Sequence, residues 1–249
     1  MESHILTEAE YVVFHQGRIR LTFEAARPFL PARATVGVIG GSPFDRMIAG
    51  WYPDWSMRNI LLVPRAEVGG SLGVPPGFDG ASVPVGGPAG PLAEAFDVVL
   101  CTEVIEHILE EDEVLLSTVA SLLRPGGLLV FSVPNAAGFG NRVKLLLGRN
   151  VHWDKRDLLR GTLGGYGHIR EYTVAEVRRL LATDFDLLAL RGVGGYRKGL
   201  SRALDLLPST YANTLVAVGR RRTPVPPTPG PVPTPAPSPR GRAEPAVSA

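Results

Sequence analysis

The sequence predicts an α/β protein with a parallel, doubly wound β-sheet and helices on both faces. Strand-like and helix-like patterns alternate through most of the 249 residues. The segment 96–135 shows this most clearly, because two predominantly apolar runs, Val98–Cys101 and Leu128–Val133, flank an amphipathic helical pattern. Apolar runs of this length are typical of strands that are covered on both faces, so we expect these two strands to be parallel neighbours.

Seven apolar runs account for the expected sheet. They are Thr35–Ile39, Asn59–Val63, Ala81–Val85, Phe96–Cys101, Leu128–Val133, Phe185–Arg191 and Asn213–Gly219. The last two runs are expected to pair as an antiparallel hairpin at the sheet edge. A Pro-Gly-Gly run at residues 125–127 is expected to stop the helix that precedes the fifth strand.

Helical patterns lie between these runs. Beyond the helix before Pro125, they are Thr7–Leu30 as one or two helices, Phe44–Trp51, Phe139–Leu147, Val174–Ala182 and Tyr196–Leu207. Thr173 and Glu176 have the spacing of a capping box, which predicts a helix start at Val174.

The composition is that of a globular protein in a reducing compartment. Hydrophobic residues make up 45% of the chain, yet no run approaches the roughly 18 apolar residues of a membrane span. The N-terminus lacks the basic and apolar regions of a signal peptide. Cys101 is the single cysteine and lies in an expected buried strand, which excludes a disulfide framework and favours a core role. We therefore expect a cytoplasmic protein without a membrane partner.

The charge is divided unevenly along the chain. The last thirty residues carry a net charge of +4, which leaves −2 for the rest. A body of this charge disfavours nucleic-acid binding. Residues 223–249 are rich in proline and are expected to form a disordered, passive or recruiting tail after a domain spanning 1–222.

An acidic turn follows the fourth expected strand. Glu103, Glu106 and His107 have the spacing i, i+3, i+4, so on a helical turn they share one face. His168 is the natural fourth member, and two carboxylates with two imidazoles suit a divalent cation. Alternatives stay open: Glu103 contacts a cofactor, Glu106 caps the turn, and His107 is a metal-free general base or a packed helix histidine.

A series of motifs resembles class I S-adenosylmethionine-dependent methyltransferases over about residues 10–220. These motifs are the glycine turn after the first strand, FDVVLCTEVIEH, RPGG, VPN and GHIREYT. The resemblance implies a Rossmann-like sheet in the order 3-2-1-4-5-7-6 with strand seven antiparallel, and a cofactor over strands one to four. The E-x-x-E-H turn is most similar to that of ubiquinone-pathway O-methyltransferases and Hen-type small-RNA 2′-O-methyltransferases.

The resemblance also implies site residues. In Hen-type enzymes two Glu and two His bind a metal that activates a hydroxyl, and Glu103, Glu106, His107 and His168 match them by type and order. The expected ion is Mg²⁺ or Mn²⁺, and the proton-moving residues are His107, His168 and Glu106. The expected cofactor-binding residues are Ile39, Gly40, Gly41, Ser42, Val63, Pro64, Thr102 and Glu103.

Three regions depart from the family pattern. In the glycine turn, Val38 stands where the family has an acid, and Ser42 and Phe44 stand at glycine positions. The second strand ends in Val63-Pro64 without the acid that usually binds the ribose hydroxyls. The loop after the third strand, Val85-Gly86-Gly87, offers no acid or amide side chain for the adenine amino group. The turn after the first strand also lacks the G-x-G-x-x-G pattern of nicotinamide-dependent oxidoreductases, which disfavours that class of enzyme.

The expected function is O-methylation of a small-molecule or sugar-like acceptor. The alternatives are a weak or inactive methyltransferase-like binding protein and, less favoured by charge, a nucleic-acid 2′-O-methyltransferase. Residues 1–31 are expected to cap the site, with Tyr11, His15 and Arg20 as candidates to close over it. Residues 139–172 are expected on the acceptor side, where His152 and Trp153 line the acceptor pocket or pack within a loop. The pattern leaves the oligomeric state open.

Overall fold

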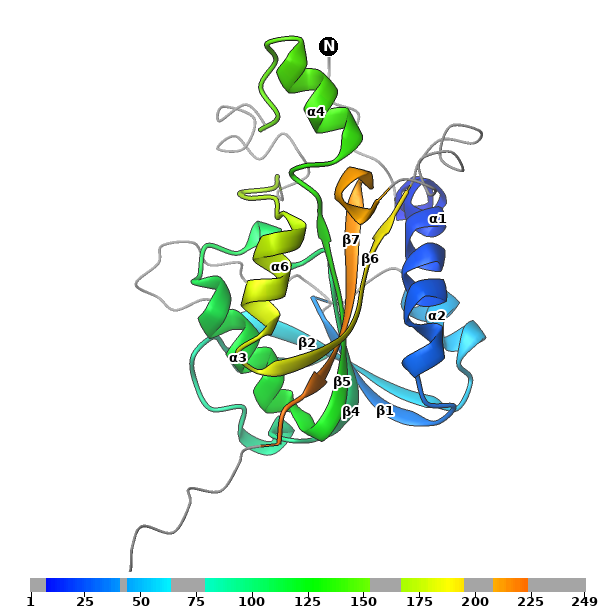
Figure 1. The fold of residues 1–249 in the computed structure, drawn as a ribbon. Coiled ribbons are helices and arrows are strands. Elements are labelled where there is room, and N and C mark those ends of the chain that lie inside the picture. The colour runs from blue at the N-terminus through cyan, green and yellow to red at the C-terminus, as the bar shows by residue number, and fades with distance from the viewer. Residues whose placement is uncertain (1–7, 41–43, 64–78, 153–166, 195–207, 224–249) are drawn as a thin grey trace, which may run out of the picture.

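Seven strands form one sheet in the order β3-β2-β1-β4-β5-β7-β6 (Figure 1). The computed structural model describes residues 8–40, 44–63, 79–152, 167–194 and 208–223. Neighbours from β3 to β5 are parallel, and β7 runs antiparallel to both β5 and β6. The expected order, the antiparallel strand seven and the edge hairpin are confirmed. The strands are β1 (Ala34–Ile39), β2 (Trp55–Val63), β3 (Ala81–Pro84), β4 (Phe96–Thr102), β5 (Leu123–Pro134), β6 (Phe185–Val193) and β7 (Thr214–Arg221).

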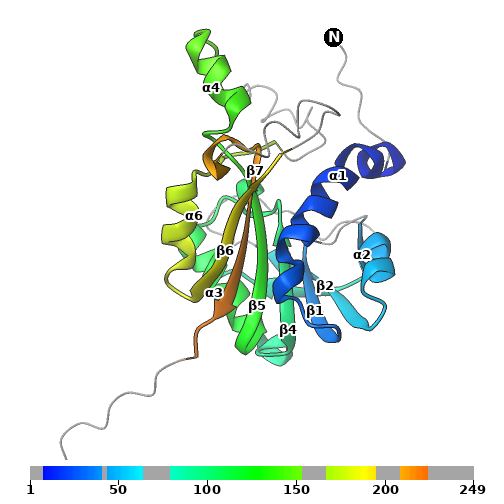
Figure 2. The same ribbon diagram turned by 45° about the vertical axis from the view of Figure 1, so that its right-hand side comes forward.

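Helices cover both faces of the sheet. Helices α1 and α2 lie on one face, and α3 and α6 lie on the other (Figures 1 and 2). The α-helices are α1 (Glu8–Ala26), α2 (Asp45–Trp51), α3 (Asp112–Leu122), α4 (Phe139–Leu146) and α6 (Val174–Leu181). Short 3₁₀ helices are η1 (Arg27–Phe29), η3 (Gly90–Leu92), η4 (Ile105–His107) and η5 (Ser209–Tyr211). Among the described residues, none of the helices has the length and apolar character that a membrane span requires.

The central strand β4 contributes to two separate cores. Val98 and Leu100 pack with residues of α1 and α2, whereas Val99 and Cys101 pack with residues of α3 and α6. Alternate side chains of a strand point to opposite faces, so a strand covered on both faces needs an unbroken apolar run. Cys101 is fully buried, as expected of a core residue.

Two strands begin earlier than their apolar runs predict. Strand β2 begins at Trp55, which is buried, stacks on Tyr52 and donates from its indole nitrogen to the carbonyl oxygen of Pro31 at 3.0 Å. Strand β5 begins at Leu123, which pairs with Phe96. The Pro-Gly-Gly run therefore lies inside β5 rather than between helix and strand. The reason is local, because α3 has already ended at Leu122 and the chain is extended from the next residue.

The predicted capping box is present at the start of α6. The Thr173 hydroxyl accepts from the Glu176 backbone N–H at 3.3 Å, and the Glu176 carboxylate accepts from the Thr173 backbone N–H at 2.8 Å. This exchange satisfies two backbone donors that helix starts otherwise leave unpaired. The helix expected at Tyr196–Leu207, most of the 151–167 insertion and the tail from residue 224 lie outside the described residues.

Candidate functional site

The chain turns sharply where β4 ends, and this turn begins the site. Glu103 follows Thr102 with a φ angle of 55°. The 3₁₀ helix η4 begins only at Ile105. A non-glycine residue with positive φ is uncommon and gathers at sites where surrounding contacts hold it. Glu103 is therefore outside the helical turn that contains Glu106 and His107, and the expectation of one shared face for all three is wrong.

Glu103 belongs to a buried ion pair instead. Its carboxylate pairs with the guanidinium of Arg18 on α1. The second carboxylate oxygen accepts from the Ser132 hydroxyl on β5 at 2.9 Å. The Glu103 backbone N–H donates to the Ser132 carbonyl oxygen at 2.9 Å. Strand β5 and the first helix thus hold the turn in place.

Glu106 is in the opposite situation. Its side chain is fully buried, and neither carboxylate oxygen has a hydrogen-bond partner among the described residues. Burial and then the negative charge of Glu103 raise the pKa of Glu106 well above its usual value. An unpaired buried carboxyl costs free energy of about 1–3 kcal/mol or more, so its retention points to a functional group rather than to a structural one.

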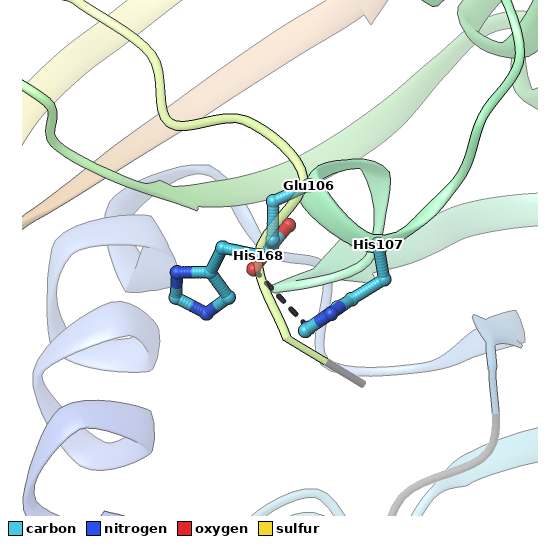
Figure 3. A group of neighbouring side chains, drawn as sticks. All are labelled: Glu106, His107 and His168. Atoms are coloured by element: carbon cyan, nitrogen blue, oxygen red, sulfur yellow. Dashed lines mark ion pairs between the residues drawn. The ribbon is translucent and has the colours of Figure 1, made fainter. Parts of the chain in front are cut away.

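Two histidines lie beside this carboxyl (Figure 3). The nearest His107 ring nitrogen, Nε2, is 3.8 Å from Glu106 Oε1. The ring centroids of His107 and His168 are 5.1 Å apart. His168 Nδ1 lies 3.4 Å from a carboxylate oxygen of Glu171. Burial alone would raise the pKa of Glu171, but the His168 contact and a hydrogen bond from the Asn141 side-chain amide outweigh it, so the pKa is lowered. Glu171 is thus an anion that orients the His168 ring.

Backbone pairing brings the two distant motifs together. The Ile169 backbone N–H donates to the Glu106 carbonyl oxygen at 2.8 Å. Tyr172 donates from its backbone N–H to the Pro134 carbonyl oxygen at 3.0 Å and from its hydroxyl to Asp112 at 2.7 Å. The segment that carries His168 is therefore fixed to η4, β5 and α3. This backbone position, rather than the length of the side chain, brings His168 close to the turn after β4.

Three of the four expected metal ligands form a compact group. Potential ligand atoms of Glu106, His107 and His168 all lie within 4.8 Å of one another. Glu103 is outside the group because its carboxylate is held by Arg18. One carboxylate and two imidazoles suit Mn²⁺, Zn²⁺ or a similar divalent cation, and the unpaired oxygens of Glu106 offer such an ion a place.

The glycine turn lies next to this group. Gly40 follows Ile39 with a φ angle of 86°, and a Cβ on Gly40 would contact the side chain of Val104 at 3.7 Å. Phe44, at a glycine position of the family pattern, is buried in the core with Ile48 and does not project from the turn. Gly41 and Ser42 lie outside the described residues.

The other expected cofactor residues are only partly described. Thr102 and Val63 are half-buried at the carboxyl ends of β4 and β2, and Pro64 lies outside the described residues. The loop after β3 is tied to helix α3, because the Gly86 backbone N–H donates to the Thr118 hydroxyl at 2.8 Å. That N–H is therefore already satisfied within the protein.

The candidates outside the cluster behave differently from one another. Arg20 is exposed and pairs with Glu24 at 2.9 Å on the surface of α1, so it does not close over the site. Burial and the nearby charge of Arg18 lower the pKa of His15 to about 4, so this imidazole is neutral at neutral pH. His152 is exposed, whereas Trp153 and the Tyr11 side chain are not described.

Sequence reasoning missed four residues that shape the site. They are Arg18, Ser132, Asn141 and Glu171. Glu171 had an available signal, because it lies three residues after His168 in the GHIREYT motif. Arg18 had none, since its partner is 85 residues away in the sequence.

Comparisons with known proteins agree with this architecture. A family described as "Methyltransferase domain" matches residues 51–189. No curated protein matches the chain by sequence.

Among solved structures, an S-adenosylmethionine-dependent methyltransferase from Thermotoga maritima, described as a possible histamine N-methyltransferase, is 14% identical with a TM-score of 0.50. The match covers 86% of this chain and 94% of that one. An S-adenosylmethionine-dependent methyltransferase from Mesorhizobium loti is 17% identical with a TM-score of 0.49, covering 80% of this chain and 97% of that one. Identities this low concern the fold alone.

Proposed function

Because this chain belongs to the methyltransferase-domain family, we propose that it transfers a methyl group from S-adenosylmethionine to a hydroxyl of a small-molecule acceptor. The observation that carries the proposal is the buried carboxyl of Glu106 beside His107 and His168, which accepts no hydrogen bond from the residues that the structure describes. This group lies past the carboxyl ends of β4 and β5, where open α/β sheets bind ligands.

The turn after β1 fits a cofactor at this edge. The left-handed Gly40 lets the backbone pass close to a ligand, and Phe44 packs into the core and leaves the turn free of its ring. Among the described residues, Ile39, Gly40, Thr102 and Glu103 would hold the cofactor. S-Adenosylmethionine would supply the activated methyl group, so the protein's task is alignment and, for an oxygen nucleophile, removal of a proton.

The polar cluster suits that proton removal. An acceptor hydroxyl beside His107 or His168 can pass its proton to a neutral imidazole. The Glu171 carboxylate orients His168 and stabilises the positive charge that this ring would gain. In an alternative arrangement, Glu106, His107 and His168 would instead hold Mg²⁺ or Mn²⁺, which when bound supplies Lewis-acid activation of the hydroxyl in place of proton transfer to a histidine.

A second candidate function is binding without methyl transfer. Val38 supports it, because this buried apolar side chain stands where the family pattern has an acid. A protein of this kind would retain the sheet and bind a nucleoside-like ligand, yet would not turn it over.

Calorimetry with S-adenosylhomocysteine tests the cofactor. We expect saturable binding, and no detectable heat at millimolar ligand would exclude both methyl transfer and nucleoside binding at this turn. Transfer of an isotopically labelled methyl group into a panel of hydroxylated small molecules then separates the two candidates.

Variants at the cluster test the chemistry. His107→Ala and His168→Ala should each lower turnover by about 10²–10⁴-fold with little change in cofactor affinity. Arg179→Ala is the control, because that exposed residue of α6 lies outside the cluster and outside the expected acceptor side. Equal turnover in all three variants would remove the histidines from the mechanism. A chelator in the same assay tests the metal.

A further inference from the structure

Helix α4 projects from the body with its apolar side chains uncovered. Both ribbon views show it extending beyond the carboxyl end of β5, away from the two helical layers (Figures 1 and 2). No residue of α4 is buried. Leu145, Leu146 and Leu147 are 59%, 86% and 68% exposed. Large apolar side chains exposed together on one short element mark an interaction surface.

Four of the apolar residues of this helix and its end lie on one side, whereas Leu145 lies on the opposite side. Phe139, Val143 and Leu146 have the spacing i, i+4, i+7, and Leu147 follows on the same side. At 3.6 residues per turn, Arg142 and Lys144 flank this apolar face on its two sides. Basic side chains beside an apolar face can keep their charges at a polar boundary while their stems lie along apolar groups.

The base of α4 is firmly attached to the body. The Asn141 side-chain amide donates to Glu171 at 2.9 Å, and Arg142 Nε donates to the Ala137 carbonyl oxygen at 2.7 Å. The Arg142 guanidinium also lies 4.5 Å from the centre of the Tyr211 ring. The helix is thus held in its projecting position by specific bonds at its base, while its far end carries the exposed leucines.

Charge separates α4 from the body that carries it. Residues 139–149 contain three basic residues and no acidic one, whereas the remainder of residues 1–219 has a net charge of −5. In a twofold pair of copies with α4 against α4, like charges would meet. A negatively charged surface is complementary to the helix, and it would repel the rest of the body.

We propose that α4 docks on an anionic lipid surface. Phe139, Val143, Leu146 and Leu147 enter the boundary between headgroups and acyl chains, and Arg142 and Lys144 lie at the level of the lipid phosphates. This proposal differs from the expectation of no membrane partner, because it places α4 at the surface of the bilayer. The inference rests on α4 alone, so it holds or fails independently of methyl transfer.

Sedimentation of the full chain with lipid vesicles tests the proposal. We expect binding to phosphatidylcholine vesicles that contain a quarter phosphatidylglycerol, weak binding to pure phosphatidylcholine, and loss of binding as salt rises. Lys144→Glu should weaken binding roughly ten-fold or more at low salt, and Leu146→Ser about ten-fold.

The controls change the same chemistry elsewhere. Arg179→Glu alters an exposed basic residue of α6, Leu109→Ser alters a leucine that is 55% exposed outside α4, and Arg240→Glu with Arg242→Glu alters the tail. All three should bind as the unaltered chain does. The proposal is overturned by absence of binding, by equal losses in α4 and control variants, or by loss only in the tail variant. It is also overturned if α4 forms a dimer that Leu146→Ser dissociates while no vesicle binding occurs.

Discussion

Strand β4 has a carboxylate near each of its ends, and the two differ in their partners. At its amino end, Asp97 accepts from the backbone N–H and hydroxyl of Thr35, both at 2.8 Å, and from Arg124 at 2.6 Å. Past its carboxyl end, Glu106 is fully buried and accepts no hydrogen bond. Burial would raise the pKa of Asp97, but the Thr35 bonds and the Arg124 charge outweigh it and lower that pKa. The pKa of Glu106 is raised.

The difference in hydrogen bonding distinguishes a carboxylate that stabilises the fold, Asp97, from one that is a candidate functional group, Glu106. Asp97 joins β4 to the start of β1 and leaves no oxygen free, which is the condition of a structural group. Glu106 keeps both oxygens available in a place where water is excluded and two imidazoles are near. Buried carboxyls with raised pKa are typical of functional sites. Glu106, past the carboxyl end of β4, is therefore a destabilising group, whereas Asp97 at the amino end is a stabilising one.

The largest expected effect is on the buried pair that holds the site end together. Arg18→Gln should lower the free energy of unfolding by about 3–5 kcal/mol, because Glu103 would keep a buried charge without its partner. The double variant with Glu103→Gln should recover much of the loss. Urea unfolding measures both. Arg20→Gln is the control, since its exposed pair with Glu24 contributes at most about 1 kcal/mol; equal costs at the two arginines would contradict the comparison.

Metal binding should distinguish the two carboxylates directly. Mn²⁺ at a hundred times its dissociation constant should stabilise the unaltered chain by about 2.7 kcal/mol, since it binds the folded state. Glu106→Gln should abolish this stabilisation, and Asp97→Asn should keep it. Thermal unfolding with and without the ion provides the measurement. A shift that survives Glu106→Gln would place the ion elsewhere.

The pH dependence of stability should have opposite signs at the two ends. A raised pKa means that folded Glu106 binds its proton more tightly than the unfolded chain does. Its ionisation therefore destabilises the fold as pH rises above the unfolded value of 4.5. Relative to Glu106→Gln, the unaltered chain should lose up to about 1.4 kcal/mol per pH unit until the folded pKa is passed. Urea unfolding in a chelator between about pH 5 and pH 8 measures this, and a constant difference would refute it.

Asp97→Asn should have the smallest effect, about 1 kcal/mol at neutral pH, because the amide still accepts from Thr35 but loses the ion pair. A lowered pKa stabilises the fold above the unfolded value of 3.8 and loses that contribution as pH falls through the folded pKa. The difference from the unaltered chain should therefore shrink in acid. A difference that grows in acid would show that Asp97 does not stabilise as an anion.

The sheet was predictable from the chain, because β4 and β5 are covered on both faces and their apolar runs are broken only by Ser132 of β5. The site was predictable only in part. Glu106, His107 and His168 come together as their types and order indicated. The place of Glu103 depended on a positive φ at a residue that is not glycine, for which spacing gives no signal. Its partner Arg18 depended on how α1 packs across the sheet, which is a tertiary contact between distant segments.

One carboxylate serves two mechanical roles. Glu171 holds the root of α4 through Asn141 with one oxygen and steadies the His168 ring with the other. Helix α4 and the His168 ring thus depend on the same carboxylate. Any displacement of α4 that breaks the Asn141 bond also releases the group on which the orientation of His168 depends. Two side-chain contacts, Asn141 to Glu171 and Glu171 to His168, therefore connect α4 to the imidazole.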